Sequence, residues 1–142
     1  MAALALTFLM AAAACGDDAE GTDPVAASGH DLRTLRLSHT VALPTELPPG
    51  LESIQTATGD GLPLISFYST NEPLVTVCTG AAERCRALTS PFATLQRRGG
   101  ALVTIDRAEA PEDASAISAE LRRFWSDIRL TTSAPTWLER SS

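Results

Sequence analysis

The chain has 142 residues, 44% hydrophobic and 20% charged, a composition that fits one ordinary globular domain and excludes a disordered chain or a multi-span membrane protein. Its formal net charge is −6, but residues 32–142 contain 12 acids and 11 arginines and therefore carry only −1. A domain so close to neutral lacks the broad basic surface that binding to nucleic acid requires.

The N-terminal segment is apolar and ends at a cysteine. Residues 2–14 contain one polar side chain, Thr7, and are too few to cross roughly 30 Å of hydrocarbon as a helix. A short apolar run of this kind is typical of a secretory signal. Because the run closes with Ala12-Ala13-Ala14 directly before Cys15, it resembles the signal peptide of bacterial lipoproteins. The resemblance implies that residues 1–14 are removed and that the thiol of Cys15 is acylated.

The residues that follow Cys15 are polar and acidic. Residues 17–31 contain five acids and neither lysine nor arginine. We therefore predict that residues 15–31 form an acidic, flexible tether, and that lipid on Cys15 holds the exported chain in a bilayer, on the outer face of the cell membrane or on another envelope membrane. Two alternatives stay open: a secretory signal that is cut elsewhere, and a buried N-terminal helix with a free thiol.

From residue 32 the sequence alternates in polarity with a period of two. Leu35, Leu37 and Val41 share one face with His39, which predicts a half-buried strand over residues 32–43. A proline-rich loop is predicted next, over residues 44–50. Further strands are predicted over residues 51–58, 62–70, 74–79, 92–97 and 101–106. Short turns join them, including glycine-containing turns at 59–61 and 98–100, so antiparallel pairing is expected.

The C-terminal third has the spacing of a helix. Pro111 suits a first helical position. Apolar side chains then recur at intervals of three or four residues, at Ala114, Ile117, Leu121, Trp125 and Ile128. We therefore predict that residues 32–142 form a single α+β domain, an antiparallel β-meander of five to six strands with one amphipathic C-terminal helix packed on the sheet.

Two cysteines lie at the end of one predicted strand. Cys78 and Cys85 are seven residues apart, and in an exported protein such a pair predicts a disulfide that closes a small loop. Their spacing differs from the CxxC pattern of redox motifs. A zinc site would have to recruit His30 from the tether and His39 from the first predicted strand, so we predict no metal and no other cofactor.

Arginine and tryptophan side chains are the candidates for contact with a partner. Arg84 and Arg86 flank the second cysteine, and Arg97 and Arg98 lie at a predicted hairpin. Together they are candidates for an anion-binding patch, because guanidinium groups bind oxyanions in a bidentate manner. Trp137, near the end of the chain, is a candidate for a surface contact, with packing back on the core as the alternative.

We identify no catalytic motif in the sequence. It has no GxSxG segment, Asp60 between two glycines is expected to be a turn residue, and His39 is expected to be a hydrogen-bonded core side chain. We therefore predict a non-catalytic envelope lipoprotein that binds a protein partner or supports an assembly. A lipoprotein that binds a small ligand between helix and sheet is the alternative. An enzyme that uses Cys78 or His39 is the third hypothesis.

Overall fold

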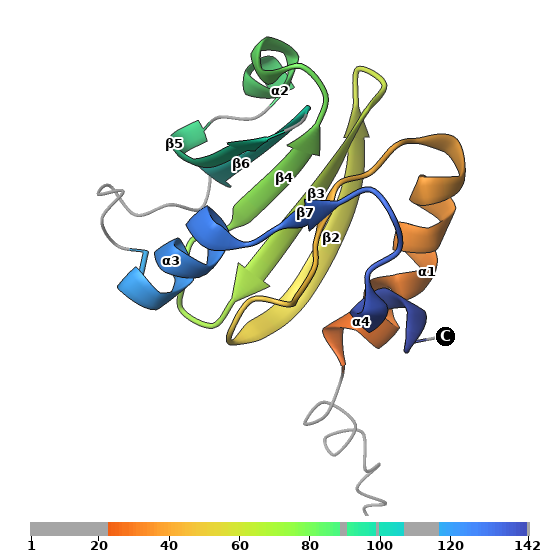
Figure 1. Ribbon diagram of the computed structural model, residues 1–142, viewed down its shortest axis with the longest axis horizontal. Helices are drawn as coiled ribbons and strands as arrows, with labels where there is room; N and C mark the ends of the chain where they lie inside the picture. Colours follow the sequence, from red (N-terminus) through yellow and green to blue (C-terminus); the bar gives the residue numbers. More distant parts are fainter. Residues whose placement is uncertain (1–22, 89–90, 99, 107–116, 142) are drawn as a thin grey trace, which may run out of the picture.

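The computed structural model describes residues 23–88, 91–98, 100–106 and 117–141 (Figure 1). Cys15 and the predicted leader lie outside the described residues. The elements in chain order are α1 (Pro24–Ser38), β1 (Leu43–Pro44), β2 (Leu51–Gly59), β3 (Leu62–Ser69), β4 (Val75–Thr79), α2 (Ala82–Leu88), β5 (Pro91–Arg98), β6 (Ala101–Asp106), α3 (Ala119–Asp127), β7 (Leu130–Thr131) and α4 (Thr136–Glu139).

Five strands form one antiparallel sheet with the order β2-β3-β4-β6-β5. The two shortest strands, β1 and β7, pair separately as a ribbon. The predicted turn between β2 and β3 is a two-residue hairpin, in which Asp60 (φ 51°) and Gly61 (φ 79°) both adopt the left-handed conformation. The predicted α+β class and the antiparallel sheet of five strands are therefore confirmed.

The connection after β4 departs from the predicted meander. The chain leaves β4 through α2, enters the far edge of the sheet as β5, and returns as β6 between β4 and β5 (Figure 1). β4 and β5 therefore run parallel to each other, with one strand between them. This order brings the end of β4, the helix α2 and the β5–β6 hairpin together at one end of the sheet, where the backbone N–H of Gly80 donates to the carbonyl of Gly100.

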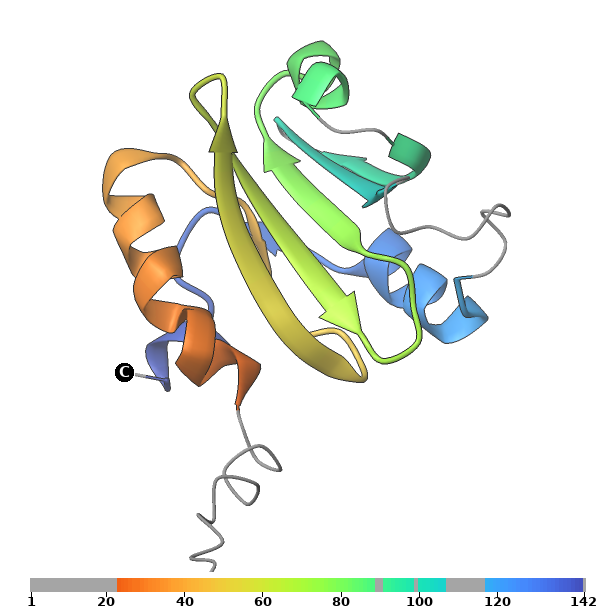
Figure 2. The same ribbon diagram turned by 180° about the vertical axis from the view of Figure 1, so that it is seen from behind.

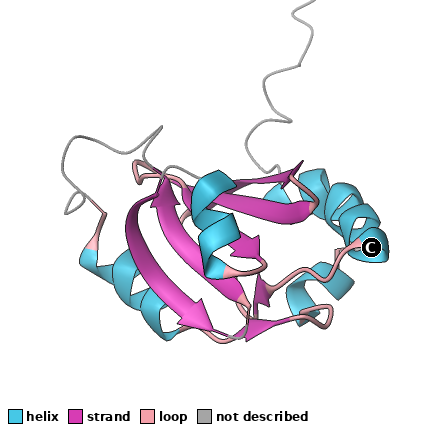
Figure 3. Ribbon diagram, turned by 90° about the horizontal axis from the view of Figure 1, so that it is seen from above, coloured by secondary structure: helices cyan, strands magenta, loops and turns pink. Residues whose placement is uncertain are grey.

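Most of the remaining elements lie on one side of the sheet. α3, α4 and the β1–β7 ribbon are in front of it in Figure 1, and α1 runs beside β2 at the sheet edge. Figure 2 shows β2, β3 and β4 from the side that none of these elements covers. Seen from above, in Figure 3, α2 lies nearest to the viewer, over the ends of the strands. The sheet therefore has one thickly covered face and one more open face.

The main hydrophobic core lies under the covered face. Trp125 of α3 has no exposed surface, and its ring centre is 5.1 Å from that of Phe67 in β3. Buried side chains from the strands and from α4 complete this cluster, among them Leu43, Ile65, Val77, Val103, Ile105 and Leu138. Each large apolar side chain that is fully buried stabilises a fold by about 1.5–3 kcal/mol, so this cluster supplies most of the driving force.

A disulfide attaches α2 to the opposite face. The sulfur atoms of Cys78 and Cys85 are 2.09 Å apart and their Cα atoms 5.7 Å apart, which confirms the predicted pair. Both cysteines are buried with Leu62 in a second, smaller cluster. Because Cys78 alternates along β4 with the core residue Val77, this cluster lies on the other face of the sheet. Closing an eight-residue ring stabilises the fold by about 2.5 kcal/mol in the chain-entropy relation.

The prediction for residues 24–43 is wrong. Residues 24–38 form α1, so there is no strand over residues 32–43 and residues 24–31 are not part of a flexible tether. Asp23 caps the helix by accepting a hydrogen bond from the backbone N–H of Val25 at 2.9 Å, and Pro24 suits the first turn. The helix is attached to the sheet edge by the hydroxyl of Ser28, which donates to the carbonyl of Ile54 in β2 at 2.8 Å.

The buried side of α1 explains the error. It consists of Val25, Ser28, Gly29 and Leu32, of which only the first and last are large and apolar. The hydrophobic residues of α1 therefore show only weak helical periodicity. Leu37, whose apolar side chain favoured the strand prediction, is 89% exposed. At Gly29 a Cβ atom would lie 3.1 Å from the guanidinium of Arg33, in the same helix, and 3.3 Å from the hydroxyl of Ser141. Two of the four buried residues on this face are therefore small, and hydrophobic spacing does not reveal it.

The prediction of a single helix is also wrong, because α1, α2 and α4 were not predicted. The predicted start of the C-terminal helix at Pro111 lies outside the described residues. The described helix, α3, begins at Ala119, after Ser118, whose hydroxyl oxygen accepts a hydrogen bond from the backbone N–H of Leu121 at 3.2 Å. Its buried side chains are Leu121 and Trp125.

A glutamine of the edge strand holds the C-terminal end of α3. Nε2 of Gln96 donates to the carbonyl oxygens of Trp125 and Ser126, each at 3.2 Å, and of Ile128, at 2.8 Å. Gln96 is itself buried. The last carbonyls of a helix have no partner within the helix, so this side chain satisfies groups that burial would otherwise leave unpaired.

Replacing Gln96 by alanine should lower the free energy of unfolding by about 2 kcal/mol, because buried carbonyl groups lose their donor. Equilibrium unfolding in urea measures this change. The matched control is Gln55→Ala, at an exposed position of β2, which should alter stability by less than about 0.5 kcal/mol. Equal losses for the two variants would contradict the role of Gln96 in holding α3.

Candidate binding groove

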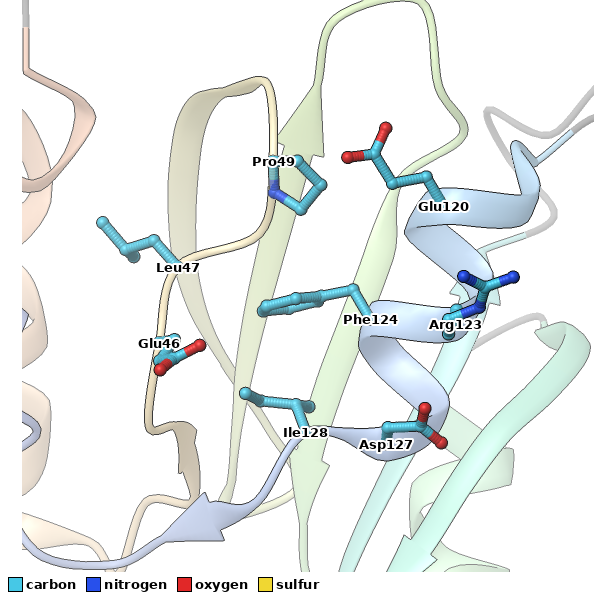
Figure 4. Close-up of a pocket in the computed structure, with 8 residues that line it drawn as sticks. All are labelled: Glu46, Leu47, Pro49, Glu120, Arg123, Phe124, Asp127 and Ile128. Carbon is cyan, nitrogen blue, oxygen red and sulfur yellow. The ribbon is translucent and has the colours of Figure 1, made fainter.

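A cavity of about 500 Å³ opens between α3 and the loop that joins β1 to β2 (Figure 4). It is lined by Glu46, Leu47 and Pro49 of the loop and by Glu120, Arg123, Phe124, Asp127 and Ile128 of α3 and its C-terminal end. We call this cavity the α3 groove. It lies beside α3 and not between that helix and the sheet, where the ligand-binding hypothesis placed a pocket and where Leu121 and Trp125 are buried.

The loop wall of the groove is held at both ends. The backbone N–H of Thr45 donates to the carbonyl of Arg129, and the N–H of Thr70 donates to the carbonyl of Gly50, both at 2.9 Å. Gly50 has a φ of 68°, a conformation that glycine adopts without strain. Pro48 is buried within the loop. The groove is therefore bounded by a fixed loop on one side and by the capped helix α3 on the other.

The floor of the groove is apolar. Leu47, Phe124 and Ile128 are half-buried and pack against the main core. The ring of Phe124 stands edge-on to Trp125, with ring centres 5.3 Å apart. Figure 4 shows Phe124 and Ile128 projecting from α3 toward the loop. An aromatic ring and two aliphatic side chains thus present partly exposed surface while their positions are set by the core.

The rim of the groove is acidic. Glu46, Glu120, Asp127 and Arg123 are exposed and give the lining a formal charge of −2. In Figure 4 the carboxylate of Glu120 lies on the loop side of α3, whereas the guanidinium of Arg123 points away from the loop. Carboxylates around an exposed aromatic ring attract an ammonium or guanidinium group, particularly one carried on an apolar body.

The predicted disulfide and the predicted arginines lie at a different part of the molecule. Arg84 and Arg86 belong to α2, and Nη2 of Arg84 donates to the carbonyl of Asp60 in the β2–β3 turn at 2.8 Å. Arg97 and Arg98 end β5 and line a cavity of about 380 Å³ next to the start of α2. The fold therefore brings the four predicted arginines to the same end of the sheet, although Arg84 is engaged with the hairpin turn.

The sequence analysis missed Arg129. This residue and Arg98 line a further cavity, of about 200 Å³. Nothing in the sequence pairs the two, because Arg98 ends a strand and Arg129 follows a helix, and their proximity depends on the pairing of β7 with β1.

The prediction that Trp137 makes a surface contact is wrong. Trp137 is only 7% exposed, and its indole Nε1–H donates to the carbonyl of Pro44 at 2.8 Å. The short helix α4 lies against α1, where Nη2 of Arg33 donates to the carbonyl of Leu138 at 2.9 Å. A tryptophan near the end of the chain is therefore a core residue, with a backbone carbonyl as the partner that a buried indole requires.

His39 is also placed differently from the prediction. It caps the C-terminal end of α1, and its Nδ1 lies 2.9 Å from the hydroxyl oxygen of Ser38. A cavity of about 360 Å³ is lined by Ser38, His39 and Asp31, residue types that a hydrolase uses. A catalytic triad of serine, histidine and an acid needs a carboxylate that hydrogen-bonds to the imidazole. Within the described residues, however, the imidazole of His39 has no hydrogen bond to a carboxylate.

The metal-site hypothesis has no cluster to support it. His30 is exposed on α1. Across residues 23–88, 91–98, 100–106 and 117–141, no three histidine, cysteine or acidic side chains group closely enough to hold a metal ion.

Comparisons with protein families, curated proteins and solved structures give no match to this chain. Of the helices described above, none is long and apolar enough to cross a membrane.

The chemistry of the α3 groove can be tested with benzyltrimethylammonium, a cation on an aromatic body. We expect saturable NMR shifts at Phe124 and Ile128, and about three- to tenfold weaker binding for Glu120→Gln, because one rim carboxylate contributes about 1 kcal/mol. Glu83→Gln, on α2, is the matched control and should bind as the wild type does. If the neutral isostere neopentylbenzene bound equally well, a cation-selective groove would be contradicted.

Proposed function

We propose that this protein is an exported, lipid-anchored binding protein whose α3 groove contacts a positively charged, partly apolar segment of a partner protein in the cell envelope. The anchor is the acylated Cys15 that the lipoprotein-like leader implies. The observation that supports a binding role is the groove itself, with apolar side chains seated on the core and three carboxylates at its rim. Apolar contacts of this kind give affinity, and charges around them select the partner.

The start of α1 limits how far such an anchor lets the domain move. Only residues 16–23 separate Cys15 from Pro24, the first residue of α1. Eight residues span at most about 28 Å. The beginning of α1 lies at the opposite end of the molecule from α2 (Figure 1). An anchored domain would therefore hold α1 near the lipid surface and direct α2 and the β5–β6 hairpin away from it.

A second candidate function uses the same groove for a small organic cation. The groove volume of about 500 Å³ lies within the roughly 300–1,000 Å³ of small-molecule sites. The half-buried ring of Phe124 favours this candidate, since aromatic faces attract ammonium groups.

The anchor is tested by metabolic labelling with a fatty-acid analogue. Cys15→Ser should abolish labelling, because the thiol is the acyl acceptor, and the protein should then leave the membrane fraction. The control is the double variant Cys78→Ser/Cys85→Ser, which removes the two cysteines of the disulfide and should still be labelled. Equal labelling of the wild type and Cys15→Ser would refute the anchor.

The partner is tested by photo-crosslinking in native cells, with a photoreactive residue at position 120 in the groove. We expect a specific protein adduct that is lost with the charge reversal Glu46→Arg, while the same photoreactive residue at position 83, on α2, gives no such adduct. Absence of the adduct together with benzyltrimethylammonium binding would favour the small-cation candidate instead. Absence of both would contradict each proposal for the groove.

A further inference from the structure

Two cavities adjoin each other near the end of the sheet that carries α2. The larger, of about 380 Å³, is lined by Gly80, Ala81, Ala82, Arg97, Arg98, Gly100 and Ala101. The smaller, of about 200 Å³, is lined by Ala42, Arg98, Ala101, Arg129, Leu130, Thr131 and Thr132. They share Arg98 and Ala101, so one arginine lines both. We call the smaller cavity the Arg98–Arg129 pocket.

Backbone pairing fixes where the two arginines of this pocket leave the chain. Arg98 pairs with Ala101 at the end of the β5–β6 hairpin, so its Cα position is set by the sheet. Arg129 directly precedes β7, and its carbonyl accepts the hydrogen bond from Thr45 described above. On the far side, Nη2 of Arg36 lies 3.5 Å from the carbonyl oxygen of Thr132. Strand pairing and loop hydrogen bonds thus hold the backbones of two exposed arginines that line the same pocket.

The pocket has an unbalanced charge. Three arginines line the two cavities, and among the described residues no carboxylate lines either of them. The acid nearest to Arg129 in the sequence is Asp127, which lines the α3 groove instead. Placing like charges together raises the electrostatic energy of the folded chain, and a bound anion lowers it.

We propose that the Arg98–Arg129 pocket binds a phosphate or sulfate group. A guanidinium group matches a pair of oxygens on such an anion, and two guanidinium-bearing residues line this pocket together with Thr131 and Thr132. The pocket volume, about 200 Å³, is below the roughly 300–1,000 Å³ of typical small-molecule sites. A pocket of this size fits a single anionic group. Arg97 extends the positive surface into the adjoining cavity, where a second phosphate of a polymer is accommodated. The proposal is independent of the function assigned to the α3 groove.

The test is a titration with inorganic phosphate at constant ionic strength, followed by backbone amide NMR. Saturable shifts are expected at Arg98, Ala101 and residues 129–132, with none in chloride of equal ionic strength. Arg98→Gln and Arg129→Gln should each weaken binding about tenfold, because each removes a charged hydrogen-bonding group. Arg123→Gln, at the rim of the α3 groove, is the matched control and should leave the affinity unchanged. Thermal unfolding verifies that each variant is folded.

A second titration, with inorganic polyphosphate, distinguishes a free ion from a phosphate polymer. Tighter binding of polyphosphate that falls with Arg97→Gln, while binding of free phosphate does not, supports a polymer as the ligand. Equal affinity for the two probes supports the free ion. The proposal is overturned if neither probe gives saturable shifts at the pocket, or if Arg123→Gln weakens binding as much as Arg98→Gln.

Discussion

Burial of Trp125 against Phe67 is the interaction on which the rest of the structure depends. α3 has only nine residues, too few to be stable as an isolated helix, so its place is set by what it buries. Trp125 inserts into the core, and Gln96 binds the carbonyls that follow on the helix. The backbone of residues 127–129 is therefore fixed relative to the sheet, and both candidate sites are built on this turn.

The turn after α3 separates opposite charges. Asp127 and Ile128 line the α3 groove, with its three carboxylates, while Arg129 lines the pocket that it shares with Arg98. A domain whose net charge is close to zero can in this way present one acidic and one basic surface. The disulfide contributes indirectly, because it attaches α2 to the open face and so supplies a wall for the cavity next to Arg97. Both cysteines are buried, so the disulfide itself is not in contact with solvent and its role is structural.

Local patterns explain which parts of the fold could be predicted. The strands over residues 51–106 alternate in polarity, and the turn at 59–61 consists of residues that tolerate positive φ. Cys78 and Cys85 are close in sequence, so their pairing needed little knowledge of the fold. The helix α1 was missed because Ser28 and Gly29 occupy half of its buried side, one to bind the backbone of β2 and the other to let Arg33 approach.

Trp137 and Arg129 show what local sequence patterns could not predict. Whether a tryptophan near the chain end is buried depends on which carbonyl it meets, and Pro44 lies almost a hundred positions away. Arg129 precedes a strand of the β1–β7 ribbon and Arg98 ends a strand of the main sheet, yet both line one pocket. Neither arrangement leaves a signal in the neighbouring residues of the sequence.

The sequence by itself determined the positions of the main strands, their tight turn and the cysteine pair. These features depend on neighbouring residues, whose periodicity and turn propensity act locally. The tertiary structure alone decided the strand order, the packing of α1, the burial of Trp137 and the two charged sites. These depend on burial and hydrogen bonds between segments far apart in the chain, and such contacts exist only once the sheet, α3 and the β1–β7 ribbon have packed together.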